Sequence, residues 1–177
     1  LRLARGGRGE RGPREVFEVN AMTLRTALLL SALAAAPLFA GPAPVRFRSI
    51  AEGTAEAKES GKPMLLFFTA EWCAPCQELK RTVFSTGAFS KQVEASFVPI
   101  EVLDRRKEEG KNPPEVEALE ERMGVRGFPT LLVTRVDGLA AVRHVGFTSR
   151  EETLQFLSGA PGRLEAAEKK AKKAQAP

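Results

Sequence analysis

The stretch that decides the fold reads Pro63-Met64-Leu65-Leu66-Phe67-Phe68-Thr69-Ala70-Glu71-Trp72-Cys73-Ala74-Pro75-Cys76. Its apolar run, residues 64–68, follows a proline and predicts a strand that is buried on both faces, as in the centre of a parallel sheet. The polar, helix-favouring residues after it predict a helix that starts at the two cysteines. The sequence therefore places a Cys-x-x-Cys pair where a buried strand meets a helix.

This position of the cysteines predicts redox chemistry. Two intervening residues allow the sulfurs to close a small disulfide. The first sulfur also lies over the unpaired N–H groups of the helix start, where a thiolate is stabilised. We therefore expect Cys73 to be the nucleophile and Cys76 the thiol that resolves the mixed disulfide. Pro75 suits the first turn of a helix, where its missing N–H is not needed.

A zinc site and a structural disulfide are the two alternatives to a redox role for the cysteine pair. A zinc site is excluded within one chain, because the sequence holds only two cysteines and one histidine, His144. We accordingly predict no metal and no cofactor. A structural disulfide stays open as the alternative, although so short a loop constrains the unfolded chain little.

Several separate motifs resemble the thioredoxin-like superfamily across residues 45–159. Ala70 to Cys76 resembles its active-site loop, with Ala74 where thioredoxin has glycine, and 124–130 resembles the segment that carries its cis-proline. Asp137-Gly138 and 145–149 resemble its last hairpin and the entry to its last helix. The resemblance implies an α/β fold with a central mixed sheet of four to five strands flanked by helices.

The resemblance also implies the surroundings of the disulfide. Phe128-Pro129 would be the cis-proline pair that faces it, and the Phe128 backbone would offer a strand-like edge to an extended substrate. Trp72 would pack beside the loop.

One position departs from thioredoxin. Phe67 stands where thioredoxin has a buried aspartate, and Ile100 is expected where it has the nearby lysine. Apolar surroundings would raise the pKa of Cys76 and slow resolution unless Glu71, Glu78 or water assists. We therefore expect a specialised reductase.

The resemblance extends to the thioredoxin-like domains of bacterial disulfide-interchange and cytochrome-maturation proteins. It implies a thiol:disulfide oxidoreductase that acts on protein thiols and receives electrons from an upstream donor. A membrane electron-transfer protein could be that donor. Ala74-Pro75 offers no histidine to stabilise the reduced form, which favours reduction over oxidation. We expect a monomer. The competing function is a thioredoxin-fold binding or chaperone-like module whose disulfide is structural.

The N-terminal residues predict export. Residues 1–21 are rich in Arg and Gly, which predicts a non-structural or mis-called extension, and Met22 is the expected true start. Residues 22–40 read as a signal peptide with Arg25 in its positive region and cleavage after Ala40, so we expect a periplasmic or otherwise exported protein. The alternative is a membrane anchor formed by 26–40.

Composition narrows the function further. The formal charge of +5 includes six Arg and three Glu in residues 1–40, which leaves +2 for the remainder. No basic patch interleaved with aromatic residues appears in that remainder, so nucleic-acid binding is not expected.

The rest of the chain predicts the remaining elements of the domain. Residues 41–44 read as a linker, 104–112 as a charged loop, and 160–177 as a charged tail that is either a solvated helix or disordered. Asp137-Gly138 predicts a hairpin turn. Pro99 lies within the strand predicted at 97–103 and indicates that this strand is at an edge of the sheet or is bulged. The predicted order is βαβαβαββα. Strands are expected at 45–50, 64–68, 97–103, 130–136 and 140–145. Helices are expected at 49–60, after Cys73 with a continuation at 88–95, from Pro113-Pro114 to Gly124, and from Ser149 to Gly159.

Overall fold

The sheet is built around β1 (Met64–Ala70), which lies between two neighbours. A computed structural model describes residues 44–176, so the predicted extension, signal peptide and most of the linker lie outside the described residues. The strand order is β2-β1-β3-β4; β2 runs parallel to β1, whereas β3 and β4 are each antiparallel to the preceding neighbour. The predicted mixed α/β sheet is confirmed, with the other strands at Val98–Asp104 (β2), Thr130–Thr134 (β3) and Ala141–Val145 (β4).

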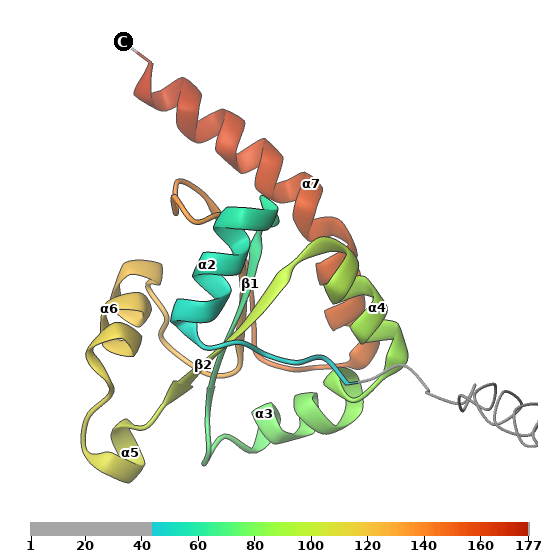
Figure 1. The fold of residues 1–177 in the computed structure, drawn as a ribbon. Helices are drawn as coiled ribbons and strands as arrows, with labels where there is room; N and C mark the ends of the chain where they lie inside the picture. Colours follow the sequence, from blue (N-terminus) through green and yellow to red (C-terminus); the bar gives the residue numbers. More distant parts are fainter. Residues whose placement is uncertain (1–43, 177) are drawn as a thin grey trace, which may run out of the picture. The chain divides into compact units, whose positions relative to one another are not determined.

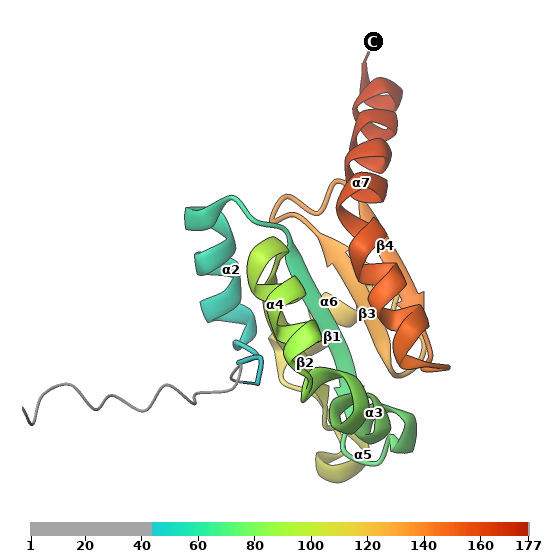
Figure 2. The ribbon, with the colours of Figure 1, turned by 90° about the vertical axis from the view of Figure 1, so that its right-hand side faces the viewer.

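Helices cover both faces of this sheet (Figures 1 and 2). Leu66 and Phe68 pack against α2 (Ile50–Ser60) and α6 (Pro114–Met123) on one face. Leu65 and Phe67 point to the other face, because successive side chains of a strand alternate. That face is covered by α3 (Ala74–Leu79), its π-helical continuation Lys80–Phe84 (η2), α4 (Gly87–Ser96) and α7 (Arg150–Gln175).

One edge of the sheet is β2, as Pro99 predicted, and the other is β4. The Arg48 N–H donates to the Pro99 carbonyl, and the Glu101 N–H donates to the Arg48 carbonyl. The strand predicted at 45–50 is thereby reduced to an isolated bridge between Arg48 and Ile100. The segment ends at Ser49, which accepts the Glu52 N–H and begins α2 with a capping box.

The last helix is longer than predicted. Ser149 caps its start as expected, but the predicted end at Gly159 is wrong, since α7 continues through Pro161 to Gln175. Leu164 explains the extension: it is buried in the core beneath the sheet and holds the additional turns in place. Pro161 has no N–H and cannot donate a helical hydrogen bond to the carbonyl four residues earlier, that of Leu157. The Arg163 guanidinium donates to the neighbouring Phe156 carbonyl at 2.7 Å. Figure 1 shows α7 running on past the sheet. Neither α7 nor any other helix of the described part could span a bilayer.

The charged stretch 104–112 is also more ordered than predicted. It contains a short helix, α5 (Arg106–Glu109), and folds around the buried Asn112. The Asn112 amide donates to Asp104 at 2.6 Å and to Glu120 at 3.1 Å, and its carbonyl accepts the Arg105 N–H at 2.7 Å. The buried amide therefore ties the end of β2 to α6.

The ionised form of Glu120 is disfavoured in this cluster. Burial raises the pKa of Glu120, and the nearby Asp104 carboxylate raises it further. Its Oε1 is buried and accepts no hydrogen bond from the described residues. The protonated form is therefore favoured in the folded protein, so the contribution of Glu120 to stability is greatest at acid pH. That contribution declines as the pH rises from its ordinary pKa through the raised value.

Replacing Glu120 with Gln should stabilise the protein near pH 7 by about 1 kcal/mol, because the substitution removes a buried charge that lies beside the Asp104 carboxylate. The gain should shrink toward zero as the pH falls below about 4, where Glu120 is itself protonated. Melting temperatures of both proteins across this pH range provide the measurement. The control is Glu117→Gln, an exposed position of the same helix. A Glu120→Gln protein that is less stable than wild type at pH 7 would contradict this account.

Candidate functional site

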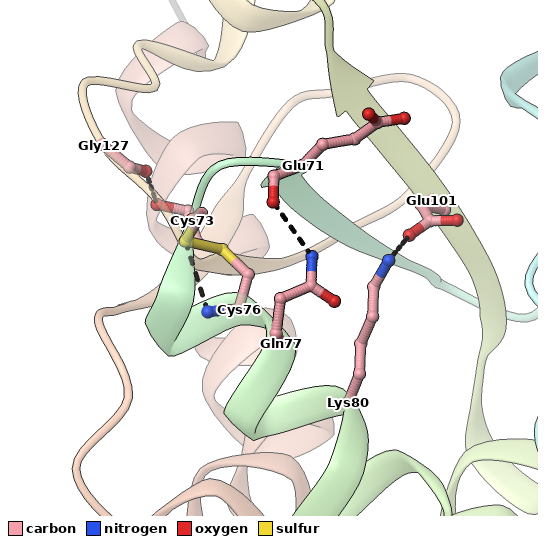
Figure 3. Close-up of a disulfide and its surroundings, with 8 residues drawn as sticks. Glu71, Cys73, Cys76, Gln77, Lys80, Glu101 and Gly127 are labelled. Atoms are coloured by element: carbon pink, nitrogen blue, oxygen red, sulfur yellow. Dashed lines mark hydrogen bonds and ion pairs between the residues drawn. A yellow bond between two sulfur atoms is a disulfide. The ribbon is translucent and has the colours of Figure 1, made fainter.

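The two cysteines follow the carboxyl end of β1. The chain turns after Ala70, whose carbonyl accepts the Cys73 N–H at 3.2 Å, and α3 begins at Ala74. Cys73 and Cys76 form a disulfide with their Cα atoms 5.2 Å apart (Figure 3). Pro75 stands in the first turn of α3 and is exposed. The local structure is the strand, turn and helix start that the sequence predicted.

The helix start distinguishes the two sulfurs. Cys73 is the N-cap of α3, and its Sγ accepts the Cys76 N–H at 3.2 Å. Cys73 is 2% exposed and Cys76 is 0% exposed, so exposure does not distinguish the two sulfurs. The hydrogen bond carries the distinction, because a donor aimed at Cys73 Sγ stabilises that sulfur as a thiolate.

The cis-proline segment lies beside the disulfide loop. The Phe128-Pro129 peptide bond is cis, and the Pro129 carbonyl accepts the Gly146 N–H at 2.8 Å. Trp72 meets Phe128 edge to face, with ring centroids 6.0 Å apart, and stays 50% exposed. These rings belong to the wall of an open hollow of about 400 Å³ next to Cys73. The structure thus brings Trp72, Phe128 and the disulfide loop together.

The two predicted proton-transfer helpers are placed differently. The Glu71 carbonyl accepts from the Gln77 amide at 3.4 Å, while its carboxylate points away from the disulfide (Figure 3). Glu78 forms an ion pair with Arg81 at 2.6 Å on the outer side of the helix. Neither carboxylate is aimed at Cys76, so a role for them in proton transfer has no geometric support.

The surroundings of Phe67 differ from the expectation. Phe67 is buried on the cysteine side, but Ile100 belongs to the opposite core cluster, because Phe67 is in register with Glu101. The expectation that Ile100 takes the place of the lysine near this position is therefore wrong. Lys80 takes part here instead: its Nζ lies 2.5 Å from Glu101 and 5.7 Å from the centre of the Phe67 ring. The surroundings of Phe67 therefore hold an ion pair as well as apolar surface.

Sequence reasoning missed this pair, although half of its signal was available. Lys80 is four residues after Cys76, on the same side of a helix, and its N–H donates to the Cys76 carbonyl. Glu101 could be found only from the strand register. Both side chains are about one-third exposed, with side-chain values of 37% and 33%, and they line a small hollow that opens beside residues 44–47. Solvent can therefore reach the ion pair.

The described residues form no cluster of three or more His, Cys, Asp or Glu side chains that could hold a metal ion. The single histidine, His144, stacks on Phe156 with ring centroids 5.4 Å apart. Cys73 and Cys76 thus remain the candidate reactive groups.

Known proteins share this architecture. A family model described as a thioredoxin-like domain matches residues 50–160. The thiol:disulfide interchange protein DsbD of Yersinia enterocolitica is 31% identical over 107 residues, which are 59% of this chain and 18% of that protein. The chain therefore spans less than a fifth of this curated relative.

Solved structures agree with the family model. A thioredoxin from Thermus thermophilus superposes with a TM-score of 0.54 at 28% identity, covering 65% of this chain and 85% of that one. The oxidised C-terminal domain of Neisseria meningitidis DsbD gives a TM-score of 0.51 at 24% identity, covering 66% and 99%. The second likeness supports the fold alone.

The ion pair behind the disulfide predicts two opposite effects on Cys76. Lys80→Met leaves the Glu101 charge uncompensated and should raise the pKa of the Cys76 thiol, whereas Glu101→Gln leaves the ammonium alone and should lower it. We expect both shifts to be small, because the pair is partly exposed to solvent. Thiolate absorbance against pH, in proteins that also carry Cys73→Ser, measures them.

The matched control is the outward-facing pair on the same helix, tested as Glu78→Gln and Arg81→Met. These variants should leave the titration of Cys76 unchanged. Shifts of the same sign for Lys80→Met and Glu101→Gln would show that the pair does not act on Cys76 through its charge.

Proposed function

We propose that this chain, which belongs to the thioredoxin-like family, is an exported thiol:disulfide oxidoreductase that reduces disulfides in partner proteins. The observation that carries the proposal is the Cys73 sulfur, held at the N-cap of α3 by the Cys76 N–H. The half-exposed Trp72 and the segment before Pro129 stand next to it and offer contact surface to a protein chain.

The reaction proceeds by two thiol–disulfide exchanges. In the reduced protein, the Cys73 thiolate attacks one sulfur of the partner disulfide and expels the other partner sulfur as a thiolate, which takes up a proton. Cys76 then loses its proton and attacks Cys73 Sγ, which releases the second partner thiolate. The second partner thiolate also takes up a proton, so two electrons have passed from the protein to the partner, whose protons come from Cys76 and solvent, and Cys73-Cys76 is left as the disulfide.

The reductive direction is supported by what surrounds the thiols. Ala74 and Pro75 lie between the cysteines and donate no side-chain hydrogen bond that would stabilise the reduced form. The single histidine of the sequence, His144, stacks on Phe156 and does not lie between the cysteines. A reductase must be reduced again, so the cycle requires an upstream dithiol donor, for which we propose a membrane electron-transfer protein.

Export is supported by the sequence of residues 22–40, with their positive start, apolar middle and small residue at the end. The periplasm or another compartment outside the cytoplasm is the proposed place of action. There the partners would be exported proteins whose disulfides need to be reduced or rearranged.

Exchange of Cys76 for Ser should trap mixed disulfides with partner proteins, because the resolving thiol is missing, whereas Cys73→Ser should trap none. Non-reducing gels of both variants from the native host provide the measurement. The unaltered protein should also reduce insulin in the presence of a dithiol. Trapping by Cys73→Ser alone would reverse the roles. No trapping, no insulin turnover and a very negative reduction potential would together support a structural disulfide in a binding module.

The proposed export predicts a mature protein that starts at Gly41. N-terminal sequencing of protein isolated from the native host, after fractionation of the cell envelope, checks this. A chain that keeps residues 26–40 and sediments with membranes would favour the anchor instead. An uncleaved chain in the soluble cytoplasm would rule out export.

A further inference from the structure

We propose that the hollow walled by Trp72 and Phe128 is a subsite for an acidic side chain of the partner protein, close to its reacting cysteine. The proposal rests on the proposed function, since it names the substrate class of the same site. It is carried by the charges around the hollow, which are mostly positive and only partly compensated.

The position of the hollow sets which substrate residue can enter it. Trp72 directly precedes Cys73, and Phe128 directly precedes Pro129, so the aromatic walls of the hollow adjoin the disulfide loop in the chain. An extended chain advances about 3.3 Å per residue. A substrate cysteine bonded to Cys73 therefore brings the side chains one or two residues away from it to the hollow.

Three cations and one carboxylate line the hollow: Arg106, Lys107, Arg126 and Asp104. Arg106 is compensated, because it lies 3.0 Å from Glu120 and 3.9 Å from Asp104. The Asp104 carboxylate is buried and accepts from Asn112 and from the Arg106 N–H. Lys107 and Arg126 are exposed and take part in no ion pair with another described residue. The excess charge of the hollow is therefore positive.

Lys107 is also held at the hollow instead of extending into solvent. Its Nζ lies over the Trp72 ring, 5.1 Å from the ring centre, which is a cation–π contact. The helix that carries it, α5, lies at the same end of the sheet as α3 in both views (Figures 1 and 2). The buried Asn112 fixes the ends of this segment. A cation placed in advance beside an aromatic wall suits a carboxylate on a short apolar stem, as in Asp or Glu.

The test uses synthetic peptides with one central cysteine, activated as its 2-pyridyl disulfide and flanked by Glu, Gln or Lys. Reduced full-length protein attacks the disulfide, and the absorbance of released thiopyridone gives the second-order rate constant. Each value is divided by the rate constant for mercaptoethanol, an uncharged thiol, which removes the intrinsic effect of the flanking charge. We expect the Glu peptide to react about three- to tenfold faster than the Gln peptide and the Lys peptide more slowly than both.

The double substitution Lys107→Gln and Arg126→Gln should bring the Glu-to-Gln ratio close to one. Lys111→Gln, on the same charged stretch but outside the hollow, should keep the full ratio. The preference should also weaken as the salt concentration rises. Trp72 is the only tryptophan, so its fluorescence during titration with a peptide carrying Ser for Cys reports binding apart from chemistry.

The outcomes separate the two proposals. If no peptide releases thiopyridone faster than mercaptoethanol predicts, the proposed function fails. If all three peptides react quickly and equally, the function stands and the acidic subsite is refuted. A Glu preference that survives the double substitution would also refute it, because the preference would then arise elsewhere.

Discussion

The complete burial of β1 is the constraint on which the rest of the structure depends. All seven of its residues are buried, with Leu66 and Phe68 facing one helical layer and Leu65 and Phe67 facing the other. A strand enclosed in this way cannot shift its register without exposing one set of side chains. Its carboxyl end is therefore a fixed point, and the turn after Ala70 delivers Cys73 to the start of α3. The packing of β1 therefore fixes the position of Cys73.

The parts of the fold that local patterns determine could be predicted from the sequence. The run 64–68, the Cys-x-x-Cys helix start, the Ser149 cap and the edge position of Pro99 each follow from a few neighbouring residues. The same is true of the active-site loop, since its cysteines adjoin the strand that positions them. The resemblance added the Phe128-Pro129 segment, which lies far from the cysteines in sequence.

What the sequence did not reveal depends on tertiary contacts. Glu101 meets Lys80 only because β1 and β2 pair with Phe67 opposite Glu101, and the sequences of two strands do not by themselves fix their register. The extension of α7 beyond Gly159 depends on the burial of Leu164, which overrides the preferences of Gly and Pro. The stretch 104–112 looked like a solvated loop because its organising residue, Asn112, is polar and yet buried.

The outer edge of β2 has a consequence for how the sheet resists pairing with other chains. An open strand edge presents unpaired N–H and C=O groups, with which an extended segment of another chain can pair. Pro99 has no N–H to offer, and Arg48 already occupies the Pro99 carbonyl and the Glu101 N–H. Backbone pairing is thus discouraged along this part of the edge. The other edge of the sheet is β4, so this protection by Pro99 and Arg48 applies to the β2 edge.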